Sequence, residues 1–152
     1  MNHKHPHVSV SVIQTKAEKD QAIRIRKIVF VDEQNVAPEI EYDEYEQVAT
    51  HIIAYLNNQA VGTARWRWTD KGFKLERFAV LSEARRNGIG AAMVAFILNE
   101  IDTSKPVYLN SQISALDFYT SLGFAAEGEI FYEANIPHRK MYYKSAESRL
   151  GK

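Results

Sequence analysis

Two arginines and two glycines stand close together in residues 85–90, Arg-Arg-Asn-Gly-Ile-Gly, directly before an apolar segment of helical character. Gly88 and Gly90 carry no Cβ, so the backbone there can approach a bulky anionic group closely. The first N–H groups of a helix have no intrahelical partner, and with the helix dipole they attract anions. Arg85 and Arg86 add guanidinium groups that bond well to phosphate oxygens. The segment therefore predicts a site for a phosphate-bearing ligand.

The segments around this turn are predicted to be regular elements. A strand is expected over residues 73–80, and an apolar helix over residues 90–101. A short strand follows over residues 107–110, and Ser114 is expected to cap a second helix that ends at Gly123. A strand, a helix and a further strand in this order indicate a parallel crossover.

An amphipathic helix is predicted near the start of the chain. Residues 15–18, Thr-Lys-Ala-Glu, form a capping-box sequence, and Ala22, Ile25 and Val29 share one face of the helix that follows. Residues 30–45 are acidic and irregular, which predicts a loop with a short helix.

Hairpins are predicted on both sides of the crossover. Residues 57–59, Asn-Asn-Gln, have the composition of a hairpin turn. Because hairpins pair antiparallel and the crossover pairs parallel, we expect an α/β (α+β) domain with a mixed sheet and helices on both faces. The further strands are predicted over residues 8–13, 51–56, 61–68, 124–127 and 138–144, with a loop over residues 128–137.

The composition bounds the classes of function. The 152 residues include 19 Lys+Arg and 19 Asp+Glu, so the basic excess of a nucleic-acid binder is missing. No run approaches the roughly 18 apolar residues of a membrane span. The lack of cysteine excludes disulfides and cysteine nucleophiles and fits a cytoplasmic protein. We expect one domain over residues 1–152, with a core over about 8–144 and a flexible stretch over 1–7.

Four segments resemble the GNAT superfamily of acetyl-CoA-dependent N-acetyltransferases. Residues 85–90 are similar to its acetyl-CoA motif, Q/R-x-x-G-x-G/A, and residues 115–124 to its second signature, A-x-x-F-Y-x-x-x-G-F. Residues 30–36 and 136–141 are similar to the F-V-x-E-Q-x-V and I-P-H-x-x-M patterns of the ElaA/YjcF-like subgroup. The resemblance implies a V-shaped mixed sheet, with the cofactor held where two parallel strands separate.

The resemblance also implies ligands and contacts: acetyl-CoA as the donor, a primary amine as the acceptor, no metal, and a homodimer by family habit. The pantetheine arm would pair with the backbone of Phe78, Ala79 and Val80 like an added strand. Many relatives carry an asparagine where this chain has Gln112, so either Gln112 or the nearby Asn110 would contact the pantetheine. The residues implied for the pyrophosphate are Arg85, Arg86, Asn87, Gly88, Ile89, Gly90 and Ala91.

Acetyl transfer to an amine needs a proton donor for the departing thiolate and a base for the amine. Tyr119 is the predicted donor, because a phenol with a pKa of about 10 is protonated at neutral pH; the alternative is that its ring only packs. A backbone N–H on the separating strand could hold the oxyanion. Glu76, expected on the same side of its strand as Phe78, and His138 compete as the base, since a neutral imidazole accepts a proton near pH 7. Transfer assisted by water alone is the third route.

Glu33 and Gln34 are predicted to line the acceptor pocket, with a structural helix-to-loop cap as the alternative. The acidic side chains of residues 39–46 either attract a cationic acceptor or form a solvated face. For the whole chain, the favoured hypothesis is an N-acetyltransferase that works by direct transfer in a ternary complex, and the alternative is a catalytically silent acyl-CoA-binding sensor. A nucleotide hydrolase is excluded, because Ala91 and Ala92 stand where a phosphate-binding loop has Lys and Ser or Thr.

Overall fold

The computed structural model describes residues 7–144, which form a seven-stranded sheet with the strand order β1-β2-β3-β4-β5-β7-β6. Every neighbouring pair is antiparallel except β4 and β5, which run parallel. The predicted mixed sheet and parallel crossover are therefore confirmed. The strands are β1 (Val8–Val12), β2 (Thr50–Leu56), β3 (Gln59–Thr69), β4 (Gly72–Val80), β5 (Val107–Gln112), β6 (Phe124–Glu133) and β7 (Ile136–Tyr143).

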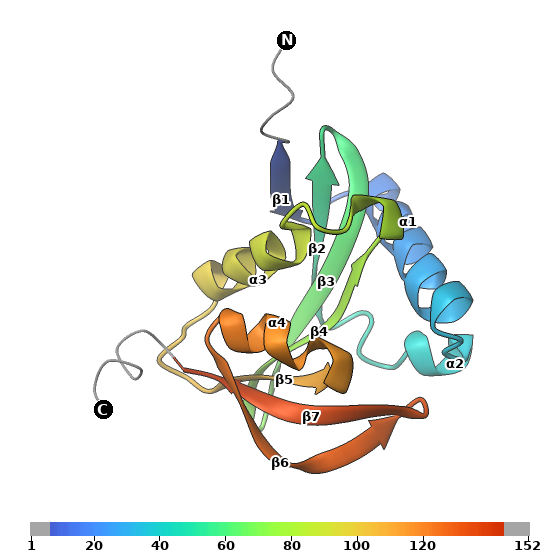
Figure 1. Cartoon of the computed structure of the whole chain (residues 1–152). Helices are drawn as coiled ribbons and strands as arrows, with labels where there is room; N and C mark the ends of the chain where they lie inside the picture. The colour runs from blue at the N-terminus through green and yellow to red at the C-terminus, as the bar shows by residue number, and fades with distance from the viewer. Residues whose placement is uncertain (1–6, 145–152) are drawn as a thin grey trace.

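Helices cover both faces of this sheet, with α1 and α2 on one side and α3 and α4 on the other (Figure 1). A π-helical segment, η1, continues α1, and two short 3₁₀ segments, η2 and η3, precede α3 and α4. Within residues 7–144, no helix is long and apolar enough to cross a membrane. The bounds are α1 (Lys16–Arg26), η1 (Lys27–Glu33), α2 (Pro38–Glu41), η2 (Ser82–Ala84), α3 (Ile89–Glu100), η3 (Ile113–Ala115) and α4 (Leu116–Ser121).

The capping box predicted before α1 is present. The Thr15 hydroxyl accepts a hydrogen bond from the Glu18 N–H at 3.1 Å, and the Glu18 carboxylate accepts one from the Thr15 N–H at 3.3 Å. Ala22, Ile25 and Val29 are buried, as the periodicity predicts. Ile25 and Val29 pack in a small core against β4, so α1 and η1 are fixed to that strand.

The turn between β2 and β3 also follows the prediction. Asn57 and Asn58 both adopt positive φ, 51° and 70°, which a two-residue hairpin of type I′ requires. The expectation of a flexible stretch over residues 1–7 lies outside the described residues, apart from His7, whose N–H donates to the Asn57 side chain at 3.0 Å.

Two predictions at the C-terminal side were wrong. Residues 128–137 are not a loop, because β6 continues to Glu133 and turns directly into β7 through two residues of positive φ. Gly128, with φ +79°, instead lies where the register between β6 and β7 shifts. Ser114 does not cap α4 and lies inside η3, whereas Gly123, with φ 102°, follows α4 as predicted.

The parallel pair β4–β5 is short. Its register covers three pairs, Phe73 with Val107, Lys74 with Tyr108, and Leu75 with Leu109, after which the two strands separate. β5 instead pairs with β7 as far as Gln112. The sheet is therefore open between the second half of β4 and the end of β5, as the family resemblance implied.

Gly72 holds the closed end of this opening. Its φ is +125°, and a Cβ added there would lie 2.3 Å from the carbonyl oxygen of Pro106, the residue directly before β5. The same oxygen accepts a hydrogen bond from the Phe73 N–H at 2.9 Å. The backbone of Gly72 therefore lies so close to the backbone of Pro106 that only glycine fits there.

We predict that Gly72→Ala lowers the free energy of unfolding by at least about 2 kcal/mol, because strain and a backbone clash add. Gly128→Ala is the matched control: its φ is +79°, but nothing lies within 4 Å of the added Cβ. The control should lose about 1 kcal/mol. Urea unfolding measures both, and equal losses would show that the contact with Pro106 is unimportant.

Candidate functional site

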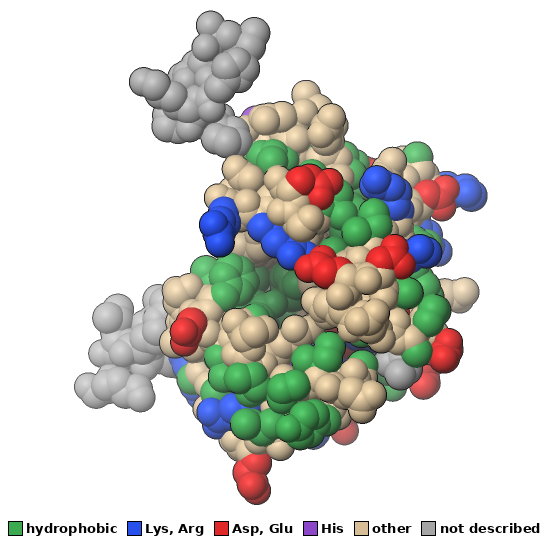
Figure 2. Space-filling model, turned by 45° about the vertical axis from the view of Figure 1, so that its right-hand side comes forward, with side chains coloured by type: hydrophobic (Ala, Val, Ile, Leu, Met, Phe, Trp, Pro, Cys, Tyr) green, Lys and Arg blue, Asp and Glu red, His purple; other side chains and the backbone are tan. Residues whose placement is uncertain are grey.

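A cavity of about 790 Å³ fills the opening between β4 and β5. Its walls come from β4, β5 and β7, the start of α3, the helix α4 and the end of η1. Figure 2 shows the hollow, with hydrophobic side chains inside it and oppositely charged side chains next to each other along its rim. In the described part of the chain, no group of three or more His, Cys, Asp or Glu side chains is placed to hold a metal ion.

The predicted phosphate turn lies at one end of this cavity. Gly88 precedes α3 with φ 76°, and a Cβ added to it would meet nothing within 4 Å. The Ala92 N–H donates to the Gly88 carbonyl at 3.0 Å and begins the helical ladder. The N–H groups before Ala92 have no acceptor within the helix, so they are available to an anion in the cavity.

Gly90 has a different reason for being small. A Cβ at this position would lie 3.0 Å from Cζ of Phe118 on α4, so the glycine lets α3 and α4 approach each other. From the sequence motif, both glycines were expected to make room for the same ligand, the pyrophosphate. In the structure the two glycines have different roles: Gly88 leaves space open beside the turn, and Gly90 makes room for Phe118.

Arg85 forms hydrogen bonds with other groups of the protein. Its guanidinium donates to both oxygens of the Glu33 carboxylate at 2.8 Å and to the Val80 carbonyl at 3.0 Å. The hydrogen bond from Arg85 lowers the pKa of Glu33, with the charge of Arg85 adding to it. Asn87 donates to the Ala84 carbonyl at 2.9 Å. Arg85 and Glu33 thus tie the end of η1 to the turn, a pairing that the sequence analysis did not anticipate.

A β-bulge interrupts β4 beside the cavity. Thr63 of β3 is opposite Ala79 but Arg65 is opposite Glu76, so β4 has one residue more than β3 over this stretch. Arg77 lies within it and has φ 61°, a left-handed conformation that is uncommon for arginine. The bulge changes which way the following side chains point.

Glu76 and Phe78 therefore face opposite sides, and the prediction that they share one was wrong. Phe78 packs edge-to-face on Tyr119 of α4, with ring centroids 5.9 Å apart. The Glu76 carboxylate instead contacts Arg65 on the side of α1 and α2. Strict alternation fails because the extra residue at Arg77 shifts it by one.

The backbone of residues 78–80 is paired on its β3 side only. Ala79 is opposite Thr63 and Val80 is opposite Gly62. Toward β5, the register of β4 ends at Leu75. This edge of β4 is therefore open to the cavity and can pair with an extended ligand.

Tyr119 lies at the α4 side of the cavity and is 9% exposed. Its ring also packs edge-to-face on Phe118 and Phe124. Burial raises the pKa of its phenol, so the group stays protonated at neutral pH. Among the described residues, no hydrogen-bond partner of its hydroxyl is found. The ring packs, as the alternative expected, and the role of the hydroxyl as a proton donor stays a prediction.

Glu76 is surrounded by cations. Its carboxylate lies 2.7 Å from Arg65, 2.9 Å from Arg67 and 3.3 Å from Lys74. Burial alone would raise the pKa of Glu76, but the charges of Arg65 and Lys74 and the hydrogen bond from Arg67 outweigh it and lower that pKa. The side chain is thus a carboxylate in an ion-pair network, and it is ionised at neutral pH.

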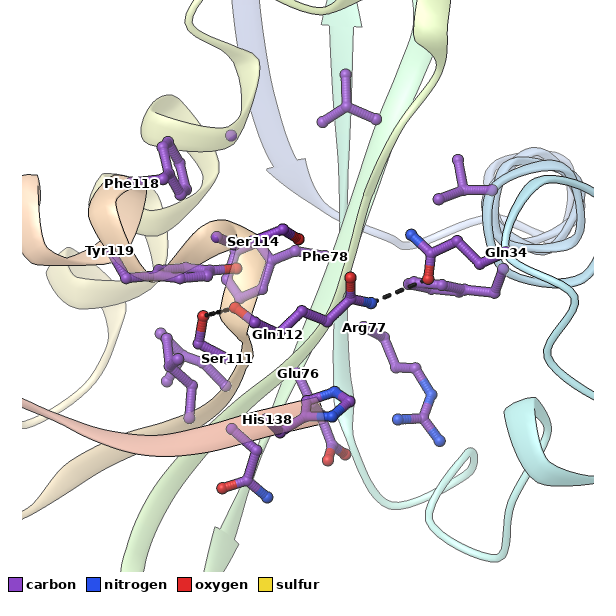
Figure 3. Close-up of a pocket in the computed structure, with 18 of the residues that line it drawn as sticks. Gln34, Glu76, Arg77, Phe78, Ser111, Gln112, Ser114, Phe118, Tyr119 and His138 are labelled. Carbon is purple, nitrogen blue, oxygen red and sulfur yellow. Dashed lines mark hydrogen bonds between the residues drawn. The ribbon is translucent and has the colours of Figure 1, made fainter. Parts of the chain in front are cut away.

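His138 and Gln112 face each other across β7 and β5, where they are register partners. Nδ1 of His138 lies 2.7 Å from the Ile136 carbonyl, which can only accept, so Nδ1 carries a proton and the lone pair of the neutral form of the ring is on Nε2. Gln112 Nε2 donates to Gln34 Oε1 at 2.9 Å (Figure 3). Gln34 directly follows η1 as its C-cap, so two predicted site residues join opposite walls of the cavity.

Three of the five carboxylates in residues 39–46 are paired with arginines, whereas Glu39 and Glu44 are exposed. Glu41 is 2% exposed and its carboxylate accepts from Arg26 at 2.7 and 3.0 Å. Glu46 accepts from Arg26 at 2.6 Å and from Arg65 at 3.0 Å, and Asp43 from Arg65 at 2.8 Å. Both interpretations from the sequence fail for these three carboxylates, because their partners come from α1 and β3. No local pattern signals such a pairing.

The comparisons with known proteins agree with this geometry. Residues 14–145 match the family model of the acetyltransferase (GNAT) domain. The chain belongs to the GNAT acetyltransferase family. YjcF of Bacillus subtilis (strain 168), an uncharacterized N-acetyltransferase, is 35% identical over 133 residues, which cover 86% of this chain and 95% of YjcF. The predicted resemblance is therefore confirmed.

Solved structures share the GNAT fold. Escherichia coli ElaA has a TM-score of 0.77 and 25% identity, covering 91% of this chain and 99% of ElaA. A GNAT family acetyltransferase from Elizabethkingia anophelis, solved with acetyl-CoA bound, has a TM-score of 0.62 and 15% identity, covering 89% of this chain and 94% of that one. The chain thus shares its overall fold with these solved structures.

We predict that Arg26→Met lowers the free energy of unfolding by about 3–5 kcal/mol, because it leaves the Glu41 carboxylate buried with its main partner removed. Lys16→Met is the control, since it removes the same charge from an exposed pair with Asp20. Chemical denaturation of both variants is the measurement. A stable Arg26→Met protein would mean that other groups neutralise Glu41.

Proposed function

We propose that this protein transfers the acetyl group of acetyl-CoA to a primary amine by direct attack within a ternary complex. The observation that carries the proposal is the opening between β4 and β5, with a helix N-terminus at one end and Tyr119 and His138 on its two sides. Membership of the GNAT acetyltransferase family supports it. The absence of cysteine from the sequence excludes a cysteine-bound acetyl intermediate.

The turn before α3 would hold the pyrophosphate of acetyl-CoA. The N–H groups of residues 86–91 supply donors, and the space beside Gly88 admits the phosphates. Arg86 adds a guanidinium at the same turn, whereas Arg85 contributes through its pairing with Glu33. The fold neighbour from Elizabethkingia anophelis, which binds acetyl-CoA, supports this choice of donor.

The pantetheine arm would extend along the open edge of β4. Backbone N–H and C=O groups of Phe78, Ala79 and Val80 pair with it as with an added strand. The Gln112 side chain reaches into the cavity from the end of β5 and offers an amide to the same arm. The thioester then lies in the opening, where an N–H of the bulged β4 can stabilise the oxyanion.

His138 would accept the proton of the amine. Its Nε2 lone pair is free, because Nδ1 donates to the Ile136 carbonyl. Glu76 is the alternative base, but its carboxylate already binds Arg65, Arg67 and Lys74, and its lowered pKa makes it a weak proton acceptor. We therefore assign the proton transfer to His138. Glu76 would remain an ionised partner of Arg65, Arg67 and Lys74.

Tyr119 would donate its proton to the departing CoA thiolate. The amine nitrogen forms a bond to the carbonyl carbon, the carbon–sulfur bond breaks, and the sulfur takes the phenolic proton. Burial raises the pKa of Tyr119, so the proton is present at neutral pH, and exchange with solvent restores it.

We predict that Tyr119→Phe lowers kcat by about 10²-fold or more while the KM for acetyl-CoA stays within a factor of about two. The aromatic ring and its contacts with Phe78, Phe118 and Phe124 remain, so thermal stability should not change. Release of CoA thiol across a panel of amines measures the effect. A protein that binds acetyl-CoA but releases no thiol with any amine would instead be a sensor.

The pH dependence distinguishes the two bases. We predict that kcat/KM rises between about pH 5 and 8, where histidine side chains lose their proton, and that His138→Ala removes this limb. The lowered pKa of Glu76 keeps its carboxylate ionised throughout this range, so Glu76→Gln should keep the limb. The opposite pattern, with the limb lost only in Glu76→Gln, would assign the proton transfer to Glu76.

A further inference from the structure

The sheet face that carries His138 continues toward a group of lysines. His138 and Lys140 are two residues apart on β7, so they face the same side about 6.6 Å apart along the strand. Their register partners on β5 are Gln112 and Asn110. A row of polar side chains therefore leads from the proposed site of proton transfer to Lys140.

Three ammonium groups gather at the end of this row. Lys74 is the register partner of Tyr108, and Lys140 is the register partner of Asn110 two residues further along β5, so the two lysines occupy neighbouring positions on one face of the sheet. Burial and the charges of Lys71 and Lys74 lower the pKa of Lys140. Lys74 pairs with Glu76 at 3.3 Å, and Lys140 lies over the Tyr108 ring, 5.3 Å from its centroid. Over residues 7–144, no carboxylate lies within 4.0 Å of the Lys71 or Lys140 ammonium. The charge of Glu133 also acts on Lys140, so Glu133 and Glu76 balance part of the charge of the three ammonium groups. The remaining positive charge suits an anionic group.

Asn110 supplies a second, independent observation between these two ends. It lines the cavity, and its Oδ1 is buried without a hydrogen-bond partner among the described residues. Its Nδ2 faces Glu133 Oε1 at 3.4 Å, and because an ionised carboxylate only accepts, the amide cannot be turned around. A buried carbonyl oxygen without a donor costs free energy, so Oδ1 suits an N–H of a ligand.

We propose that the acceptor is a primary amine that carries an anionic group, a carboxylate or a phosphate, several bonds away from the nitrogen. The amine would lie between His138 Nε2 and Asn110 Oδ1, and the anionic group would bind Lys140 with Lys74 and Lys71 beside it. This inference rests on the proposed function and names its substrate class.

A series of amines of one length tests the substrate class. At saturating acetyl-CoA, we expect 5-aminopentanoate or 5-aminopentyl phosphate to release thiol with a kcat/KM at least about tenfold above that of pentylamine or 1,5-diaminopentane. Comparison of the first two tells whether the anion is a carboxylate or a phosphate. If pentylamine or the diamine is used equally well, the inference fails while the proposed function stands.

A pair of lysine variants tests the position. Lys140→Met should raise the KM for the anionic amine about tenfold while the KM for acetyl-CoA and for pentylamine stays unchanged. Lys144→Met is the matched control, because it removes the same charge just beyond β7, where Lys144 pairs with Glu127 at 3.4 Å. An equal effect of Lys140→Met on all amines, or none, would overturn the inference.

If no amine releases thiol, the proposed function fails, and a binding measurement then tests the inference separately. Calorimetric titration of the CoA-saturated protein with the same four amines needs no turnover. Tighter binding of an anionic amine than of pentylamine by at least about tenfold, lost in Lys140→Met and kept in Lys144→Met, would support the inference. Equal affinities would contradict it.

Discussion

The short pairing between β4 and β5 is the constraint on which the rest of the structure depends. After three residue pairs, the last at Leu75 and Leu109, the two parallel strands separate. The contact of Gly72 with Pro106 fixes the closed end, while β3 and β7 keep the outer edges of the two strands paired. The open inner edges leave backbone groups and a cavity in the middle of the sheet, where a continuous ladder would have filled the space.

This opening connects two chemically different faces. Tyr119 and Phe78 lie on the side of α4, in aromatic surroundings that keep the phenol protonated. His138, Gln112 and Glu76 lie on the side of α1 and α2, among charged and amide groups. A thioester held in the opening would present its carbonyl to an amine from the polar face and its sulfur to the phenol. The bulge at Arg77 contributes, because it turns Glu76 and Phe78 to opposite faces.

Features that depend on neighbouring residues could be predicted from the sequence, whereas those that depend on distant pairing could not. The capping box at Thr15 and the turn at Asn57 are local, and both are present. The bulge at Arg77 has no glycine or proline to signal it. The buried pair of Arg26 and Glu41 joins α1 to α2, and nothing in the residues around Glu41 distinguishes it from a surface charge. Likewise Arg85, predicted to bind phosphate, pairs with Glu33 52 residues away.

The central claim is that the opening between β4 and β5, together with the turn before α3, binds CoA. Titration of the isotope-labelled protein with CoA, followed through its backbone amide signals by NMR, tests it most directly. We expect the largest changes at the N–H groups of residues 86–91 and 78–80, because most of these residues line the cavity. Changes confined to other surfaces, or no change at saturating CoA, would contradict the account.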